Sequence, residues 1–222
     1  MEENKIVFDH VRKEFPGVVA LKDISFSIKK GEVHALLGEN GAGKSTLLNI
    51  LHGVFTATSG EILLDGKPAN YSSPYEAIEK GVIKVHQEVQ VVENLNVAQN
   101  IALGFERTKA GLLDYKDINA RVDAILQDLG CSFKSIDSVS GLGVGDLQMM
   151  AIAKSLYHNA DVISLDEPTS ALSTTEIEKL FDSLMRDYLI NSFLFWQVRG
   201  EGIQNYKFYE FLRNDISQEE LE

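Results

Sequence analysis

The stretch of sequence that decides the fold reads Gly38-Glu39-Asn40-Gly41-Ala42-Gly43-Lys44-Ser45, which fits the pattern G-x-x-x-x-G-K-[ST]. Glycines at these spacings let the backbone curl until successive N–H groups point at phosphate oxygens. Lys44 adds a point charge, the N-terminus of a following helix adds a favourable dipole, and Ser45 can hold Mg²⁺. The motif predicts a nucleotide phosphate site with contacts from Gly38, Asn40, Gly41, Ala42, Gly43, Lys44, Ser45 and Thr46.

The residues on either side place this motif between a strand and a helix. Before it, Val33-His34-Ala35-Leu36-Leu37 is a short, mostly apolar run bounded by glycines, typical of a strand buried on both faces. After it, Leu47, Leu48, Ile50 and Leu51 begin an apolar helix. A chance glycine-rich turn would require neither neighbour, so the context favours the phosphate site.

A second site is indicated by two carboxylates further along the chain. The apolar run Val162-Ile163-Ser164-Leu165 ends in Asp166-Glu167-Pro168. Adjacent strand residues face opposite ways, so Asp166 can reach a metal while Glu167 acts as general base toward a water. The same residues alone are equally typical of a solvated turn, and only the phosphate motif upstream favours the functional interpretation.

The remaining pattern predicts an α/β layered domain. Ile24, Phe26 and Ile28 alternate with serines, as in an antiparallel strand with one buried face. Apolar residues at helical spacing predict a helix over residues 115–129, ended by Gly130. Another helix is expected where Ser173-x-x-Glu176 has the spacing of a capping box.

Composition narrows the function classes. With 33 acidic and 21 basic side chains the chain carries a formal charge of −12, which disfavours nucleic acid as a partner. The acidic N-terminus predicts no signal peptide, and no apolar run approaches the length of a membrane span. The single cysteine, Cys131, cannot form an intramolecular disulfide, and we expect a cytoplasmic location.

With Leu142-Gly143-Val144-Gly145-Asp146-Leu147-Gln148 placed ahead of Asp166, the chain resembles an ABC-type ATPase. The stretches 15–18, 31–44 and 86–88 look most like the first cassette of monosaccharide importers. The resemblance implies an α/β P-loop NTPase fold of ABC type, in which a mixed central sheet joins an antiparallel β subdomain and a helical subdomain. It assigns residues 1–188 to a nucleotide-binding domain with the helical subdomain roughly at 90–160.

The same resemblance implies ATP and Mg²⁺ as ligands. Phe15 would stack on adenine, and Gly143 and Gly145 would contact ATP bound by a second cassette. Gln87 would touch both the metal and the attacking water. The resemblance thus implies catalytic roles for Lys44, Gln87 and Glu167 and metal ligation by Ser45, Gln87 and Asp166. The implied partners are a second cassette, membrane permease subunits on the inner face of the cell membrane and, indirectly, a sugar-binding protein.

The sequence departs from the family pattern at several places. Gly143 stands where the family has a serine, and Ser173 where it has an acidic residue. A switch histidine is expected near residues 196–202, yet all five histidines lie at or before His158. We therefore expect residues 189–222 to be a divergent, poorly ordered segment, and the chain to correspond to a truncated or frame-shifted first half of an importer subunit.

Three hypotheses follow from these observations. The first is an ATPase subunit that drives sugar uptake through permease subunits. The second is an ATP-binding fragment without turnover, favoured by the missing serine and histidine. The third is a soluble ABC-type factor outside transport, which would require a basic surface for nucleic acid and is disfavoured by the charge of −12.

Overall fold

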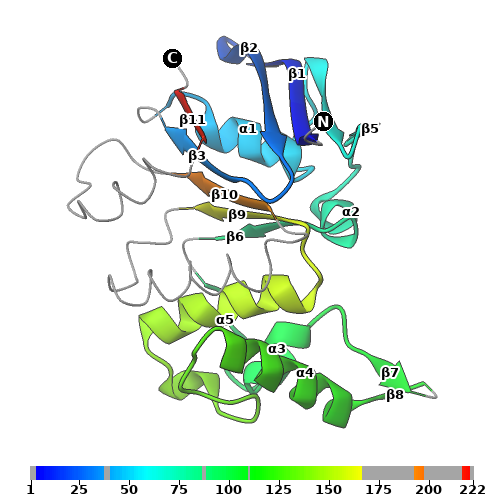
Figure 1. Ribbon diagram of the computed structural model, residues 1–222, viewed down its shortest axis with the longest axis vertical. Coiled ribbons are helices and arrows are strands. Elements are labelled where there is room, and N and C mark those ends of the chain that lie inside the picture. The colour runs from blue at the N-terminus through cyan, green and yellow to red at the C-terminus, as the bar shows by residue number, and fades with distance from the viewer. Residues whose placement is uncertain are drawn as a thin grey trace. The chain divides into compact units, whose positions relative to one another are not determined.

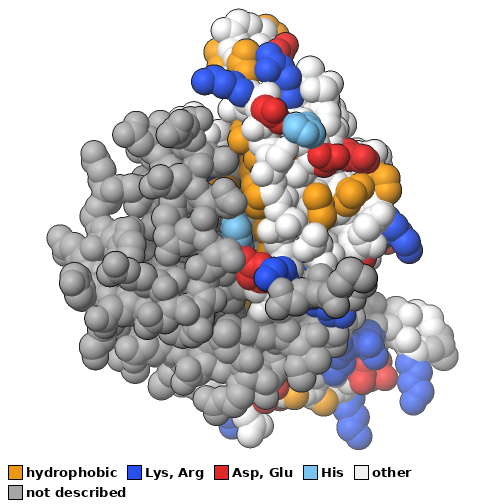
Figure 2. Space-filling view, turned by 45° about the horizontal axis from the view of Figure 1, so that its top comes forward, with side chains coloured by type: hydrophobic (Ala, Val, Ile, Leu, Met, Phe, Trp, Pro, Cys, Tyr) orange, Lys and Arg blue, Asp and Glu red, His pale blue; other side chains and the backbone are white. Residues whose placement is uncertain are grey.

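The computed structural model divides the chain into two compact units, the first formed by Met1–Lys84, Asp161–Glu167 and Ile190–Glu222 and the second by Val85–Ala160 and Pro168–Leu189 (Figure 1). The described residues are 4–37, 41–86, 89–109, 111–166, 193–197 and 217–220. On the face shown in Figure 2, acidic and basic side chains are interspersed over the described surface. No helix within these ranges is long and apolar enough to cross a bilayer.

An antiparallel sheet begins the first unit. Its strands are β1 (Asn4–Phe15), β2 (Val18–Lys29), β4 (Ser59–Leu64) and β5 (Lys67–Pro68), in the order β2-β1-β4-β5. Ile28 on β2 is fully buried while its neighbours Ser27 and Lys29 are exposed, which confirms the alternation expected there.

The second sheet of this unit has the order β11-β3-β10-β9-β6. Its members are β3 (Val33–Leu37), β6 (Val82–Val85), β9 (Val162–Asp166), β10 (Phe193–Gln197) and β11 (Ser217–Glu220). β3 pairs in parallel with both β10 and β11, and β10 pairs in parallel with β9. The interior position of β3 confirms the strand expected before the phosphate motif.

Two helices complete the described part of this unit, α1 (Lys44–Leu51) and α2 (Pro74–Glu79). The apolar side of α1, with Leu47, Leu48 and Leu51 fully buried, packs into one core with residues of the antiparallel sheet such as Phe8 and Ile62. Ser73 caps α2 by accepting a hydrogen bond from the Glu76 N–H. The core therefore fixes the helix that follows the phosphate motif.

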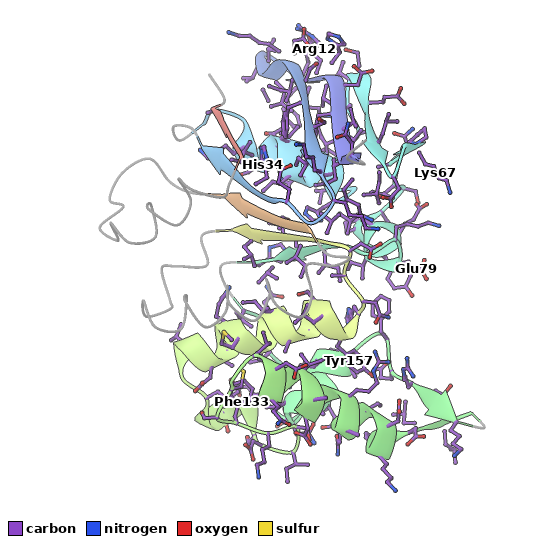
Figure 3. The ribbon with its side chains drawn as sticks, in the orientation of Figure 1. Arg12, His34, Lys67, Glu79, Phe133 and Tyr157 are labelled. Carbon is purple, nitrogen blue, oxygen red and sulfur yellow. The ribbon has the colours of Figure 1, made fainter. Side chains whose placement is uncertain are left out.

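The second unit is mainly helical. It contains α3 (Val97–Ala102), α4 (Tyr115–Asp128), a short 3₁₀ turn η1 (Val139–Gly141) and α5 (Val144–Tyr157), with a hairpin of β7 (Thr108–Lys109) and β8 (Leu112–Leu113). Figure 3 labels Phe133 and Tyr157, which lie in this unit and are almost fully buried. Met149, Met150 and Ile152 on α5 are buried too.

The fold class expected from the sequence is confirmed. The helix predicted over 115–129 forms as α4, and Gly130 follows it at a φ of 67°. The helix predicted to begin at Ser173 lies outside the described residues. The subdomain limits proposed at 90–160 and at 189 remain predictions.

Candidate nucleotide site

The described part of the phosphate motif, which begins at Gly41, contains one glycine that is sterically required; we call this part of the loop, with the start of α1, the cradle. Gly43 has a φ of 94° and is the N-cap of α1. A Cβ built on it would lie 2.6 Å from Leu21 Cδ2 and 2.7 Å from the carbonyl oxygen of Ala20 on β2. Gly41 also has a positive φ, 88°, but a Cβ there would meet nothing within 4 Å. The backbone at Gly43 therefore lies close against β2, whereas there is open space beside Gly41.

The start of α1 suits an anionic ligand. The first turn of α1 contains no acidic side chain, and its N-cap residue makes no side-chain cap hydrogen bond. These residues therefore provide no group that would compete with an anion at the helix N-terminus. Lys44 is buried at 4% exposure, Ser45 is exposed, and Ala42 and Thr46 are half-buried. A helix N-terminus favours negative charge, and a buried ammonium adds to that field. The cradle therefore fits a polyphosphate.

Not every residue expected at the site falls in the described ranges. Gly38, Asn40, Gln87 and Glu167 lie outside them. Asp166 is the last residue of β9, where its backbone pairs with Gln197 of β10. Serine and aspartate oxygens are ligands that Mg²⁺ accepts, so the chemistry of Ser45 and Asp166 fits that ion.

Phe15 ends β1 and belongs to a small aromatic cluster. Its ring meets that of Phe55 edge-on, with centroids 5.3 Å apart and an interplanar angle of 78°. The Nζ of Lys13 lies over both rings, 5.0 Å from the centroid of Phe15 and 5.7 Å from that of Phe55. The same Nζ donates to the carbonyl oxygen of Thr56 at 2.8 Å. The half-buried Phe15 ring is thus held from two directions.

Sequence reasoning missed Lys13 and Phe55. The position of Lys13 beside Phe15 could have been predicted, because residues two apart on a strand share a face and Lys13 precedes Phe15 by two. The position of Phe55 could not, since it follows α1 and reaches Phe15 only through the tertiary fold.

The stretch that includes Gly143 and Gly145 begins α5 in the second unit. Gly143 is the N-cap, with φ −72° and ψ 169°, and its N–H donates to Asp146 Oδ2 at 3.4 Å. Gly145 lies in the first turn of the same helix. A Cβ on Gly143 would have only that carboxylate oxygen nearby, at 3.8 Å. A serine would therefore fit at position 143 without strain.

Cys131 is a poor nucleophile in this unit. Burial, with a smaller contribution from the charge of Asp146, raises the pKa of its thiol to about 12. The thiol therefore stays protonated near neutral pH.

The family described as ABC transporter matches residues 21–170. The chain belongs to this family. A ribose import ATP-binding protein, RbsA, of Yersinia pestis bv. Antiqua is 43% identical over 177 residues, covering 80% of this chain and 35% of the relative. An arabinose import ATP-binding protein, AraG, of Vibrio parahaemolyticus is 47% identical over 174 residues, covering 78% and 34%. The chain thus spans about a third of the length of the curated relatives it matches.

A solved structure supports the same assignment. The chain is similar to cbiO1 from Clostridium perfringens, part of the ABC transporter complex cbiONQ, with a TM-score of 0.77 and 29% identity. The match covers 89% of this chain and 79% of that one. The family and its nucleotide-binding cassette fold, expected from the motifs, are confirmed.

Proposed function

We propose that the chain is the ATP-binding and ATP-hydrolysing cassette of an importer that takes up a monosaccharide. The cradle at Gly43 carries the nucleotide part of this proposal, because only a glycine fits there and the helix behind it favours anions. The relatives named for ribose and arabinose import carry the transport part.

In this proposal the site residues have different roles in the transfer of a phosphoryl group from ATP to water. The loop N–H groups and Lys44 bind the β- and γ-phosphates, and Phe15 stacks on adenine. Ser45, Asp166 and Gln87 would hold Mg²⁺, which neutralises charge developing on the phosphate oxygens. Glu167 accepts a proton from the attacking water.

The proposed partners follow from the same assignment. The α5 N-terminus at Gly143 and Gly145 would face ATP bound by a second cassette, and membrane permease subunits would receive the conformational change. A sugar-binding protein would act through those permeases. The chain would then sit on the inner face of the cell membrane.

ATP binding by purified protein tests the nucleotide part. Fluorescent ATP should bind the wild type, and Lys44→Ala should abolish binding because a phosphate-neutralising charge is lost. Lys67→Ala, on the exposed strand β5, serves as the matched control and should bind like the wild type. Equal binding by the wild type and Lys44→Ala would show that the site is assigned wrongly.

A second candidate is ATP binding without turnover. Gly143 favours it, because this residue offers only a backbone N–H, and Asp146 already accepts that hydrogen bond. Phosphate release measured with and without permease-containing membranes separates the two candidates. Release that depends on Glu167 and rises with the membranes supports the first candidate.

A further inference from the structure

We propose that His52 is a positioning residue that fixes the strand carrying Asp166 against the helix of the phosphate loop, by a buried hydrogen bond with Ser164. The bond joins His52 Nε2 to Ser164 Oγ. This inference rests on the proposed function, since it assigns Asp166 to the metal of a bound Mg·ATP.

The backbone around His52 is fixed. His52 is the C-cap of α1, and its N–H donates to the carbonyl oxygen of Leu48 at 2.9 Å. Gly53 follows with a φ of 69°, and a Cβ there would lie 2.8 Å from Tyr71 Cβ and 2.9 Å from the Ser73 carbonyl oxygen. Because the backbone has so little conformational freedom at this turn, it holds the imidazole of His52 in a defined position.

Ser164 is equally constrained. It lies in β9, which runs between β10 and β6 inside the second sheet of the first unit (Figure 1). Its own exposure is 0%, and its neighbours Ile163 and Leu165 are buried as well. A hydroxyl and an imidazole removed from water in such apolar surroundings each need a hydrogen-bond partner. The bond between them therefore stabilises one relative position of the two elements.

This bond adds directionality to the apolar core that α1 and β9 share, to which Leu48 and Val162 belong. Apolar contacts are non-directional and tolerate small sliding movements, whereas a hydrogen bond weakens steeply when its geometry changes. Ser164 precedes Asp166 by two residues, or about 7 Å along the strand. The bond thus fixes the position of α1, which begins with Lys44 and Ser45, relative to β9, which ends with Asp166.

Binding of Mg²⁺ should depend on this relative position of α1 and β9 more than binding of the phosphates does. The phosphate contacts come from one loop and the start of α1, and so do not require β9. The metal would need Ser45 from α1 and Asp166 from β9 together, and Mg²⁺ tolerates little departure from octahedral geometry. Losing the bond should weaken Mg²⁺ binding to the ATP complex and leave Mg²⁺-free ATP binding unchanged.

The test titrates Mg²⁺ into the protein with fluorescent ATP and, separately, titrates the nucleotide in EDTA. Ser164→Ala should lower the apparent Mg²⁺ affinity about tenfold, the lower end of effects seen for groups behind a metal ligand. His52→Gln removes the imidazole from the other side and provides a second variant. Ser164→Thr keeps the hydroxyl and should restore most of the affinity. The double variant Ser164→Ala/His52→Gln should lose no more than either single change.

Ile62→Val is the destabilising control, because it truncates a buried side chain of β4 in the same core and leaves the bond intact. It should lower thermal stability without changing Mg²⁺ affinity. An unchanged Mg²⁺ affinity in Ser164→Ala, or a loss in Ile62→Val of the same size, would overturn the positioning role. A wild type that does not bind ATP even in EDTA would instead overturn the proposed function.

Discussion

Gly41 and Gly43 share a left-handed backbone in the phosphate loop but differ in their surroundings. Gly43→Ala combines an unfavourable φ with contacts of 2.6 Å and 2.7 Å, whereas Gly41→Ala has the unfavourable φ alone. We expect Gly43→Ala to lower the free energy of unfolding by about 2–4 kcal/mol and abolish ATP binding, and Gly41→Ala to lower it by about 1 kcal/mol. Urea unfolding and ATP titration measure both. Equal effects would contradict the close approach to β2.

Phe15 offers a ring rather than a charge, so its effect should depend on the base of the nucleotide. Phe15→Ala should weaken ATP binding about tenfold, because base stacking contributes about 1–3 kcal/mol, and leave binding of inorganic triphosphate unchanged. Phe15→Trp should retain ATP affinity, and Lys13→Met should produce a smaller loss through the less constrained ring. Competition titrations with the two ligands measure these effects. An equal loss for both ligands would show that Phe15 has no adenine contact.

The phosphate loop was predictable at the residue scale because its chemistry is local. Backbone N–H groups, a lysine and a hydroxyl follow one another in sequence, and the helix expected after them forms as α1. Their contacts with a nucleotide stay a prediction. The bond between His52 and Ser164 was not predictable in this way. Each residue lies in an apolar run that packing explains, and only the tertiary fold brings the two side chains together.

At the scale of elements, the ends of a helix could be predicted from its capping residues, whereas the order of the strands in a sheet could not be predicted. Helix α4 begins after Asp114, which accepts a hydrogen bond from the Asp117 N–H, and ends before Gly130. Both signals are visible in the sequence. The order β11-β3-β10-β9-β6 has no comparable signal. The sequences of β3, β6, β9 and β10 are similarly apolar, so any two of them could pair, and β11 has the polar sequence Ser-Gln-Glu-Glu.

One contact between elements should make stability depend on pH. His158, the C-cap of α5, donates from Nε2 to the carbonyl oxygen of Ile101 on α3 at 3.0 Å. Phe105, Tyr157, Lys154 and Glu106 also face it. Burial lowers the pKa of His158 to about 4, so the folded protein holds this imidazole neutral at pH 7.

The sign follows from proton uptake. Between pH 6.5 and 4 the unfolded chain binds a proton at this position that the folded chain does not, so the free energy of unfolding falls as pH falls. The slope is at most about 1.4 kcal/mol per pH unit and smaller here, because the ring is partly exposed. Urea unfolding at pH 7.5, 6 and 5 should show a flatter profile for His158→Gln than for the wild type. Parallel profiles would assign the pH dependence to other groups.

At the scale of the whole molecule, the proposed hydrolysis would require groups from two cassettes. The resemblance places an opposite cassette over the γ-phosphate through a serine, and this chain has Gly143 there. Since Gly143 has an ordinary backbone conformation and room for a Cβ, the missing hydroxyl is a difference in chemistry rather than a constraint of the fold.

The last prediction concerns turnover. The isolated chain should bind Mg·ATP but release phosphate at the background rate of a Glu167→Gln control. Removing one preorganised donor commonly lowers a rate about 10²- to 10³-fold. Here Gly143 stands where the family has a serine, and no histidine follows His158 in the sequence. Gly143→Ser should increase ATP-dependent self-association in the Glu167→Gln background, measured by sedimentation, because it restores a donor toward the partner's phosphate. It should not raise the turnover of the isolated chain, since the histidine is still missing and the permease-containing membranes are left out. Robust Glu167-dependent release by the unmodified chain would show that another group supplies the missing charge, such as Arg199, which lies in sequence within the range 196–202 where the histidine is expected.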